Sequence, residues 1–354
     1  MRRRDLAGVL WGGAAWGQQR VELFRRGQEG VHTYRIPALI ETRGGDLLAV
    51  ADARLDSDRD LPGRIRLVMR RSGDGGRSWG AITTLKEVRE GGVGDASLLR
   101  ERDGRIWCFF AYGPPGIGFP TAQAGELTGP TVLQSWAMHS DDAGRSWTQP
   151  VDLTPRIRDR RWQAMFPTSG THFVTRRGRM VVPMVVRDEN GVISSRNAYS
   201  DDRGKTWAIG PGIRPGSDES KAVELANGEM YQNMRYRNQR LVGWSRDGGV
   251  SFDRVREDEQ LTDAVCNAGL ARVGRWLVLT NAASRKRENL VIRASGDGGW
   301  SWGAPRVLHA GPAAYSTVIG LRGGDLGVLY ECGEQGPTER IEFQRLKLAE
   351  VAKG

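Results

Sequence analysis

Three charged side chains in the first sixty residues have types and spacing that could bind or protonate an acidic ligand. Arg35 stands in the segment Tyr34-Arg35-Ile36-Pro37, and Arg54 and Asp60 follow later in the chain. Apolar residues alternate over 37–40 and again over 47–51, with Gly44-Gly45-Asp46 between them, which predicts a hairpin. The hairpin would bring two guanidinium groups and a carboxylate to the ends of neighbouring strands. Taken alone, an arginine beside Ile-Pro is more often a surface or salt-bridged residue, so the rest of the chain must decide.

Composition indicates a β protein with an anionic partner. The 354-residue chain has a formal net charge of +10, but its arginines are scattered, which argues against a nucleic-acid-binding protein. Forty-eight glycines and twelve tryptophans are typical of the tight turns and aromatic plugs of a repetitive all-β protein. The three cysteines and four histidines are isolated from one another. We therefore expect no metal site and no dense disulfide framework, while a single disulfide stays open.

The first seventeen residues have the pattern of an export signal. A basic start, Met1-Arg2-Arg3-Arg4, precedes a short apolar run and small residues up to position 17, as in secretory signals. The pair Arg3-Arg4 with Leu6 resembles a twin-arginine signal, which predicts a secreted or periplasmic protein. A disordered basic tail is the alternative. No stretch approaches the roughly 20 apolar residues of a membrane span, so we expect a soluble protein with no membrane partner.

One short pattern occurs five times and predicts the fold. Each copy has the form Ser-x-Asp-x-Gly-x-x-aromatic, with aspartates at Asp74, Asp142, Asp202, Asp247 and Asp297. In such a turn the aspartate accepts hydrogen bonds from backbone amides, the glycine takes a positive φ, and the aromatic ring caps the apolar layer. Each copy follows an apolar or alternating segment, so it should join two antiparallel strands. Five copies are better explained by a repeated fold unit than by five metal or catalytic sites.

The spacing of these aspartates predicts the architecture. They recur at intervals of roughly 45 to 70 residues, which suits the four-stranded blades of a propeller. Five turns leave room for a sixth blade without the pattern, closed by pairing of a strand near 21–24 with the last segment, 341–348. No linker or low-complexity tract divides the chain. We therefore predict an all-β fold, a six-bladed β-propeller of four-stranded antiparallel sheets, as one domain over residues 18–354.

The arginine segment and the repeated turns together resemble the exo-α-sialidase (neuraminidase) family, six-bladed propellers that remove terminal sialic acids from glycans. Members of that family hold the sugar carboxylate with three arginines from different blades. The resemblance implies Arg35 as the first and Arg235, at the end of segment 219–235, as the second. For the third, segment 284–290 offers Arg285 and Arg287, and spacing to the following strand favours Arg287. Independently of the family, converging guanidinium forks suit a buried carboxylate because they give bidentate bonds that lysine cannot.

The resemblance also implies three catalytic side chains. Asp60, in Asp60-Leu61-Pro62-Gly63, matches the acid/base aspartate; Asp56 and Asp58 lie close by, and Asp58 is the second choice. Tyr315 resembles the nucleophile and Glu219 its base. A neutral phenol suits this reaction because the anomeric carbon of sialic acid already carries a carboxylate that would repel Asp or Glu. With an ordinary pKa of about 10, the phenol needs a neighbouring base.

The remaining implied positions surround these residues. Glu331 matches the acidic residue that orients the first arginine, while Arg54 and Asp95 match rim positions near the sugar carboxylate and N-acyl group. A strand-end salt bridge would explain either of the last two equally well. Segment 162–173 replaces a Gly-Pro-Gly-rich segment of many relatives and should contribute to the pocket wall. This departure leaves open whether the substrate is N-acylated or deaminated.

We therefore expect a secreted, retaining exo-α-sialidase that needs no cofactor and no metal. It would act as a monomer on sialylated glycoconjugates or oligosaccharides, with no nucleic-acid partner. Two alternatives remain. One is a hydrolase or transglycosylase that acts on a deaminated or other nonulosonic acid, and the other is a non-catalytic sialic-acid-binding propeller.

Overall fold

The computed structural model describes residues 20–353, and within them almost all regular structure is β-strand. The all-β prediction is confirmed. The proposed export signal at 1–17 lies outside the described residues. Between 20 and 353, the helices are the short segments η1 (Gln28–Gly30), α1 (Thr154–Ile157) and α2 (Leu348–Val351). None of them is long or apolar enough to cross a membrane.

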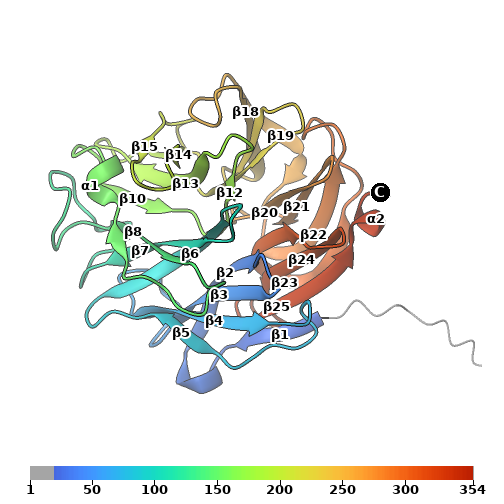
Figure 1. Ribbon diagram of the computed structural model, residues 1–354, viewed down its shortest axis with the longest axis horizontal. Helices are drawn as coiled ribbons and strands as arrows, with labels where there is room; N and C mark the ends of the chain where they lie inside the picture. Colours follow the sequence, from blue (N-terminus) through green and yellow to red (C-terminus); the bar gives the residue numbers. More distant parts are fainter. Residues whose placement is uncertain (1–19, 354) are drawn as a thin grey trace, which may run out of the picture.

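The strands form five sheets arranged around a common centre (Figure 1). Two sheets have four strands each and run in simple chain order: β2 (Thr33–Glu41), β3 (Leu47–Arg54), β4 (Ile65–Ser72), β5 (Thr83–Lys86); and β16 (Ser220–Glu224), β17 (Met230–Met234), β18 (Gln239–Ser245), β19 (Arg254–Thr262). Neighbouring strands within these two sheets are antiparallel. They match the predicted four-stranded unit.

Two further sheets have five strands each, one short strand more than the predicted four-stranded unit. The first contains β6 (Gly92–Arg100), β7 (Ile106–Gly113), β8 (Gln134–Ser140), β9 (Val151–Asp152) and β11 (Gly170–Thr171). The second contains β10 (Ala164–Pro167), β12 (Phe173–Val174), β13 (Met180–Arg187), β14 (Ile193–Ser200) and β15 (Ala208–Ile209). Strand β11 is parallel to β6, which differs from the antiparallel pairing expected throughout. The connection after β10 therefore ties two neighbouring sheets together.

The fifth sheet has seven strands because one long strand pairs with different neighbours along its two halves. Its members are β1 (Arg20–Arg25), β20 (Gly269–Val273), β21 (Trp276–Ala282), β22 (Glu288–Ser295), β23 (Arg306–Gly320), β24 (Asp325–Cys332) and β25 (Arg340–Lys347). The first half of β23 pairs with β22 and its second half with β24. Strand β1 pairs antiparallel with β25, so the predicted closure between the N-terminal and C-terminal segments is confirmed.

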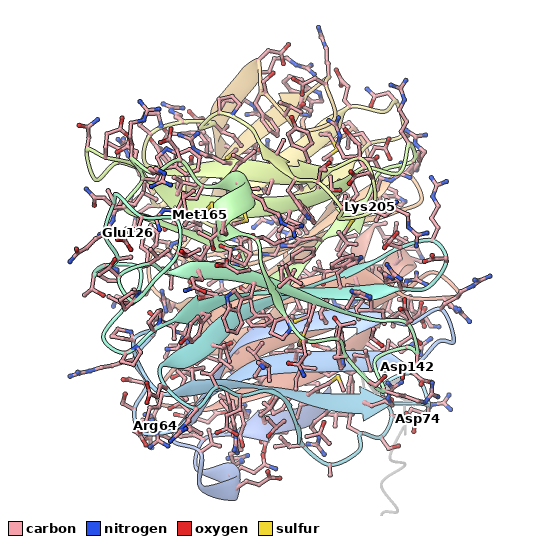
Figure 2. The ribbon with its side chains drawn as sticks, turned by 60° about the vertical axis from the view of Figure 1, so that its left-hand side comes forward. Arg64, Asp74, Glu126, Asp142, Met165 and Lys205 are labelled. Carbon is pink, nitrogen blue, oxygen red and sulfur yellow. The ribbon has the colours of Figure 1, made fainter. Side chains whose placement is uncertain are left out.

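All five repeated turns join antiparallel strands, as predicted. In the first copy, Asp74 accepts hydrogen bonds from the backbone N–H groups of Arg77 and Ser78 at 2.9 Å and from the Ser78 hydroxyl at 2.6 Å. Gly76 has φ +94°, and a Cβ atom there would overlap the ring of Phe343. Figure 2 shows Asp74 and Asp142 together at one edge of the molecule, with Arg64 at the opposite edge. The aspartates are thus structural parts of the turns.

Strand register separates the turns from the predicted site. Thr33 of β2 is paired with Arg54 of β3, and Arg54 with Ile65 of β4. At the other end of the same sheet, Leu47 is paired with Ser72, which begins the first repeated turn. Arg35 and Arg54 therefore lie at the sheet end remote from that turn.

The turn aspartates predict a loss of stability in acid. The Thr206 hydroxyl and backbone N–H lower the pKa of Asp202 from 3.8 to about 2, and equivalent contacts lower the pKa of Asp74 and Asp142. A carboxyl group with a lower pKa in the folded state stabilises the fold above pH 3.8, and this contribution is lost as the pH falls toward 2. We expect the urea midpoint to fall across that window, and Asp202→Asn to flatten the fall. A variant with an undiminished slope would contradict this explanation.

Each of the three cysteines is free and buried. The single disulfide that the sequence left open is therefore not formed. Cys266 packs with Ile36, Ala314 and Tyr315 in a small apolar cluster, so it contributes packing beside the predicted site.

Candidate active site

The arginine segment forms a distorted start to strand β2. The register of β2 against β3 shifts between Arg35 and Ala38, and Ile36 has φ +61°. A positive φ at a β-branched residue is unfavourable and persists only where surrounding contacts hold it. Here the Ile36 N–H donates to Glu331 Oε1 at 2.8 Å. Proline at position 37 has no N–H to leave unpaired in the bulge.

Glu331 of β24 holds three groups at once. Its carboxylate accepts from Arg35 Nε at 3.1 Å and from Arg35 Nη2 at 3.0 Å, a bidentate pair in a fully buried position. It also accepts the backbone N–H groups of Ile36 and, at 3.1 Å, of Tyr315. The acidic residue expected to orient Arg35 therefore also connects β2 with the backbone that carries Tyr315.

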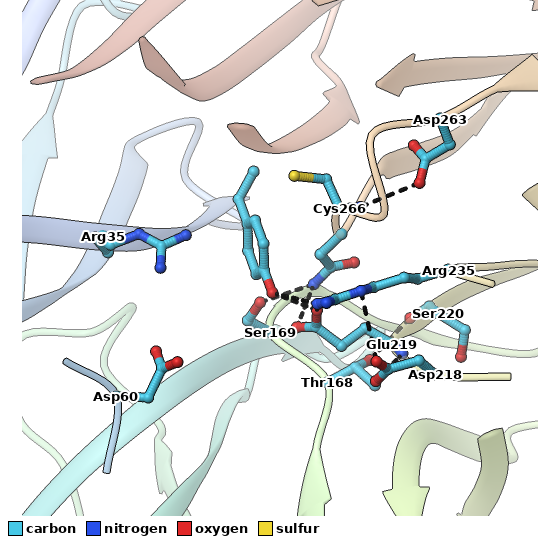
Figure 3. A network of polar contacts seen from close by, with 12 residues as sticks. Arg35, Asp60, Thr168, Ser169, Asp218, Glu219, Ser220, Arg235, Asp263 and Cys266 are labelled. Carbon is cyan, nitrogen blue, oxygen red and sulfur yellow. Dashed lines mark hydrogen bonds and ion pairs between the residues drawn. The ribbon is translucent and has the colours of Figure 1, made fainter. Parts of the chain in front are cut away.

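Tyr315, Glu219 and Arg235 form a closed triangle. The Tyr315 hydroxyl donates to Glu219 Oε2 at 2.5 Å, and Arg235 Nη1 donates to the same carboxylate oxygen at 2.8 Å and to the Tyr315 oxygen at 2.9 Å. Glu219 directly precedes β16 and Arg235 directly follows β17, which pair as a hairpin. Tyr315 lies where the register of β23 against β24 shifts. Figure 3 shows this network with Arg35 and Asp60 across from it.

The environment of Tyr315 keeps the phenol protonated. Burial, and next the negative charge of Glu219, raise the pKa of Tyr315 well above 10, while Arg235 and Arg35 oppose that rise. A neutral phenol is a weak nucleophile, so attack requires transfer of its proton to a base. Glu219 already accepts the hydrogen bond along which that proton would move.

The three predicted arginines surround the Tyr315 ring. The Arg35 guanidinium carbon lies 5.0 Å from the ring centroid and that of Arg287 lies 5.7 Å from it, while Arg235 contacts the hydroxyl. Arg285, the other candidate for the third position, is exposed. Glu331 neutralises Arg35 and Glu219 neutralises Arg235, whereas no acidic side chain of residues 20–353 pairs with Arg287. Among the three arginines, Arg287 is therefore the one whose charge no carboxylate of the described residues pairs with, and it is available to an incoming anion.

Asp60 reaches the same space from the loop after β3. Its side chain is 77% exposed and pairs with the buried Arg54. A second guanidinium nitrogen of Arg54 donates to the Asp58 carbonyl. Arg54 is thus buried beneath the loop 58–60, where its guanidinium group holds the Asp60 carboxylate. This position differs from the rim position expected from the sequence. Asp56 instead pairs with exposed Arg64.

Asp95 lies on the cavity wall in a second strained bulge. It has φ +58° where β6 shifts register against β7, and its N–H donates to the buried carboxylate of Asp52 at 3.1 Å. Burial raises the pKa of Asp52 to about 7, and burial together with Asp52 raises the pKa of Asp95 well above its usual range. The direction of this shift favours the neutral form of the Asp95 carboxyl group, the form that can donate a hydrogen bond to a ligand.

These residues enclose a cavity of about 280 Å³. Its lining combines polar and apolar side chains, and the apolar residues Leu61, Ala111, Phe119, Leu133 and Phe166 pack together as an apolar wall. The lining residues are Ile36, Asp60, Leu61, Asp95, Ala111, Phe119, Pro120, Leu133, Phe166, Ile193, Asp218, Glu219, Arg235 and Tyr315. Phe166 comes from segment 162–173, so part of that segment forms the wall as expected, whereas Trp162 packs in the core.

Sequence reasoning missed several neighbours of these residues. Asp218 forms an ion pair with Arg235 at 3.5 Å, and Asn267 donates to Glu219 Oε1 at 3.2 Å. Asp218 could have been suspected because it adjoins Glu219. Asn267 and Asp52 carry no local pattern that marks them, since only the packing of separate sheets brings them to the site.

Comparison with known proteins supports a single family. The model of the BNR repeat-like domain matches residues 45–328. A sialidase from Micromonospora viridifaciens is 35% identical over 341 residues, which covers 88% of this chain and 52% of the relative. A sialidase from Bacteroides fragilis is 27% identical, covering 92% of this chain and 64% of that protein. The chain thus spans between about half and two thirds of the length of these relatives.

A solved structure agrees with these matches. The Hadza microbial sialidase Hz136 superposes with a TM-score of 0.83 at 27% identity, over 93% of this chain and 68% of the other. The resemblance to exo-α-sialidases that the arginine segment and the turns indicated is therefore confirmed. Because the domain model covers most of this chain and the matched proteins are sialidases, the chain belongs to the BNR repeat-like, sialidase-related family.

Proposed function

We infer that this protein is a retaining exo-α-sialidase, a glycoside hydrolase that releases terminal sialic acids from glycoconjugates. The observation that carries the proposal is the Tyr315–Glu219–Arg235 triangle, in which one carboxylate oxygen lies 2.5 Å from a buried phenol oxygen. Glu219, Arg235 and Tyr315 line a cavity of about 280 Å³, a size that suits a single terminal sugar. The sialidases that the chain resembles support the same activity.

We assign the fold to a six-bladed propeller. Strand β23 has fifteen residues and changes partner from β22 to β24 near its middle. Division of the seven-stranded sheet at β23 yields one unit of β20–β23 and another of β23–β25 with β1. Together with the other four sheets, this division makes six units. The pairing of β1 with β25 would close the ring.

Arg35, Arg235 and Arg287 would bind the substrate carboxylate. Planar guanidinium groups bind carboxylates through charge-assisted, bidentate bonds, and a preorganised site avoids the cost of ordering them on binding. Glu331 already fixes Arg35 in one orientation. This orientation would place the anomeric carbon near the Tyr315 oxygen.

Two steps would follow with retention of configuration. Tyr315 attacks the anomeric carbon as its proton passes to Glu219, and Asp60 protonates the departing glycosidic oxygen. Water, deprotonated by Asp60, then attacks the anomeric carbon and displaces the tyrosine oxygen, which recovers its proton from Glu219. Proton NMR of the first-formed free sugar tests this scheme, because retention requires the α-anomer to appear first. Initial formation of the β-anomer would exclude a glycosyl-tyrosine intermediate.

Asp60→Ala tests the proton donor. We expect kcat/KM toward a sialylated oligosaccharide to fall by about 10²- to 10⁴-fold, as for other general acids. The fall should be much smaller for an aryl sialoside, whose phenolate leaves without protonation. Asp58→Ala is the matched control, since its carbonyl rather than its side chain holds Arg54. Equal losses on both substrates, or an equal loss in Asp58→Ala, would contradict the assignment.

The apolar wall favours an N-acylated substrate over a deaminated one. Phe119, Leu133, Phe166 and Ile193 line the cavity, and burial of an acyl methyl group against them would stabilise the bound substrate. Parallel assays with N-acetylated and deaminated fluorogenic sialosides test this preference. Faster hydrolysis of the deaminated substrate would favour the alternative nonulosonic-acid hydrolase.

The same assays separate the remaining alternatives. A non-catalytic sialic-acid-binding protein would bind an unsaturated sialic acid analogue and hydrolyse neither substrate. A transglycosylase would yield a transferred or rearranged sugar instead of free sialic acid, which chromatography of the products identifies.

A further inference from the structure

A buried lysine lies directly behind the Tyr315–Glu219 pair. Lys221 lies on β16, two residues after Glu219, which directly precedes that strand, and side chains two residues apart along an extended chain point to the same face. Its side chain is 2% exposed, and no acidic group among residues 20–353 is within ion-pair distance of its Nζ atom. An ammonium group held in the interior without an ion pair destabilises the fold, so its presence beside Glu219 calls for a specific role.

Asn267 connects this ammonium group to Glu219. Lys221 Nζ donates to Asn267 Oδ1 at 2.7 Å, and Asn267 Nδ2 donates to Glu219 Oε1 at 3.2 Å and to Ser169 Oγ at 2.9 Å. Because an ammonium group has no acceptor, it can contact only the carbonyl oxygen of the amide. Lys221 therefore fixes which end of Asn267 faces Glu219.

The two oxygens of Glu219 thus have separate partners. Oε1 accepts from Asn267, while Oε2 accepts from Tyr315 and Arg235. A flipped Asn267 amide would place its carbonyl oxygen against a carboxylate oxygen, which is repulsive. The orientation of the amide consequently decides whether Glu219 keeps Oε2 toward Tyr315.

Gly170 packs closely against the Lys221 side chain. Gly170 has φ +105°, and a Cβ atom there would lie 2.6 Å from Lys221 Cε. Burial, the largest effect, and the nearby Arg240 lower the pKa of Lys221 to about 7, whereas Glu219 and Asp95 oppose this shift. His172 also faces this region, and burial lowers its pKa to about 3, so it stays neutral near pH 7.

We propose that Lys221 and Asn267 are positioning residues for Glu219: the ammonium group orients the Asn267 amide, and the amide holds Glu219 so that its other oxygen faces Tyr315. This inference rests on the proposed function, in which Glu219 is the base for Tyr315.

Lys221→Met and Asn267→Leu remove the two links while they keep much of each side chain's volume. With an N-acetylated aryl sialoside, we expect each variant to lower kcat by about tenfold, since a small misplacement of a catalytic group is costly, with little change in KM. The double variant should lose no more kcat than the less active of the two single variants, because both residues act through one contact. Arg293→Met, which removes a buried cation remote from the site, is the control.

The pH profile supplies a readout that packing alone would not change. Lys221→Met lacks the ammonium group at every pH, whereas the wild type keeps it only below the pKa of Lys221, about 7. The ratio of wild-type to variant kcat/KM should fall as the pH rises through about 7, where wild-type Lys221 loses its charge. Wild-type kcat in either variant, multiplicative losses in the double variant, or a ratio of wild-type to Lys221→Met kcat/KM that does not change with pH would overturn the inference.

Crystal structures of the wild type and Lys221→Met keep the two proposals separate. We expect the variant to lose the hydrogen bond between Asn267 Nδ2 and Glu219 Oε1. If the wild type hydrolyses no sialoside, the proposed function fails and the positioning role is decided by these structures alone. An unchanged Glu219 orientation in the variant would overturn the positioning role even in an active enzyme.

Discussion

Tyr315→Phe is expected to lower kcat toward an N-acetylated aryl sialoside by about 10³-fold or more, as does removal of a nucleophile in other enzymes with covalent intermediates. The variant lacks only the hydroxyl that lies 2.5 Å from Glu219 and 2.9 Å from Arg235. The ring, which the guanidinium groups of Arg35 and Arg287 approach, stays in place. Steady-state kinetics with the fluorogenic substrate measures the loss.

Binding distinguishes loss of the nucleophile from loss of the site. Because Tyr315→Phe retains Arg35, Arg235 and Arg287, we expect the dissociation constant for an unsaturated sialic acid analogue to stay within about tenfold of wild type, which corresponds to one or two altered hydrogen bonds. Tyr330→Phe is a matched control: its hydroxyl is also buried but contacts Glu342 instead of the site. A kcat for Tyr315→Phe similar to that of this control would exclude the proposed nucleophile.

Glu331→Ala is expected to lower the free energy of unfolding by about 3–5 kcal/mol, the range for breaking a buried ion pair at one partner. The substitution leaves the Arg35 guanidinium and the N–H groups of Ile36 and Tyr315 without their acceptor. It also releases the strained Ile36 backbone. Urea denaturation followed by tryptophan fluorescence measures the change.

The neighbouring Glu334 provides a control for loss of negative charge. It is 76% exposed and pairs with Arg340 at 3.1 Å, so Glu334→Ala should change the free energy of unfolding by about 1 kcal/mol or less. Equal effects of the two substitutions would show that burial of Glu331 has no special role. We also expect Glu331→Ala to raise KM for sialosides, because Arg35 would lose its fixed orientation.

Much of the fold was predictable because its signals are local. A turn of eight residues contains its own hydrogen-bond acceptor, its glycine and its aromatic cap, so each of the five copies can be identified without knowledge of its neighbours. The pairing of β1 with β25 followed from the same repeat, since one unit lacked a turn. The sharing of β23 between two partners was not predictable, because nothing in a continuous strand marks where the partner changes.

The site was predictable only in part. The family resemblance singled out Arg35, Arg235, Arg287 and Tyr315, and the structure brings all four together. Arg54 was expected at the rim, but it is buried because it pairs with Asp60 and holds the Asp58 carbonyl. An arginine at the end of a strand has the same sequence pattern in either position. Its burial depends on the fold of the loop that follows.

The segment Tyr34-Arg35-Ile36-Pro37 illustrates what each level determines. The sequence by itself determined a strand that begins with an arginine and a bulge-compatible proline, within a chain of repeated turns. Only the tertiary structure decided that this arginine lies beside Tyr315 in a fixed orientation, because its acceptor, Glu331, is 296 positions away. The same holds for Lys221 and Asn267. Hydrogen bonds between distant strands depend on how whole sheets pack, and no local pattern of residues encodes that packing.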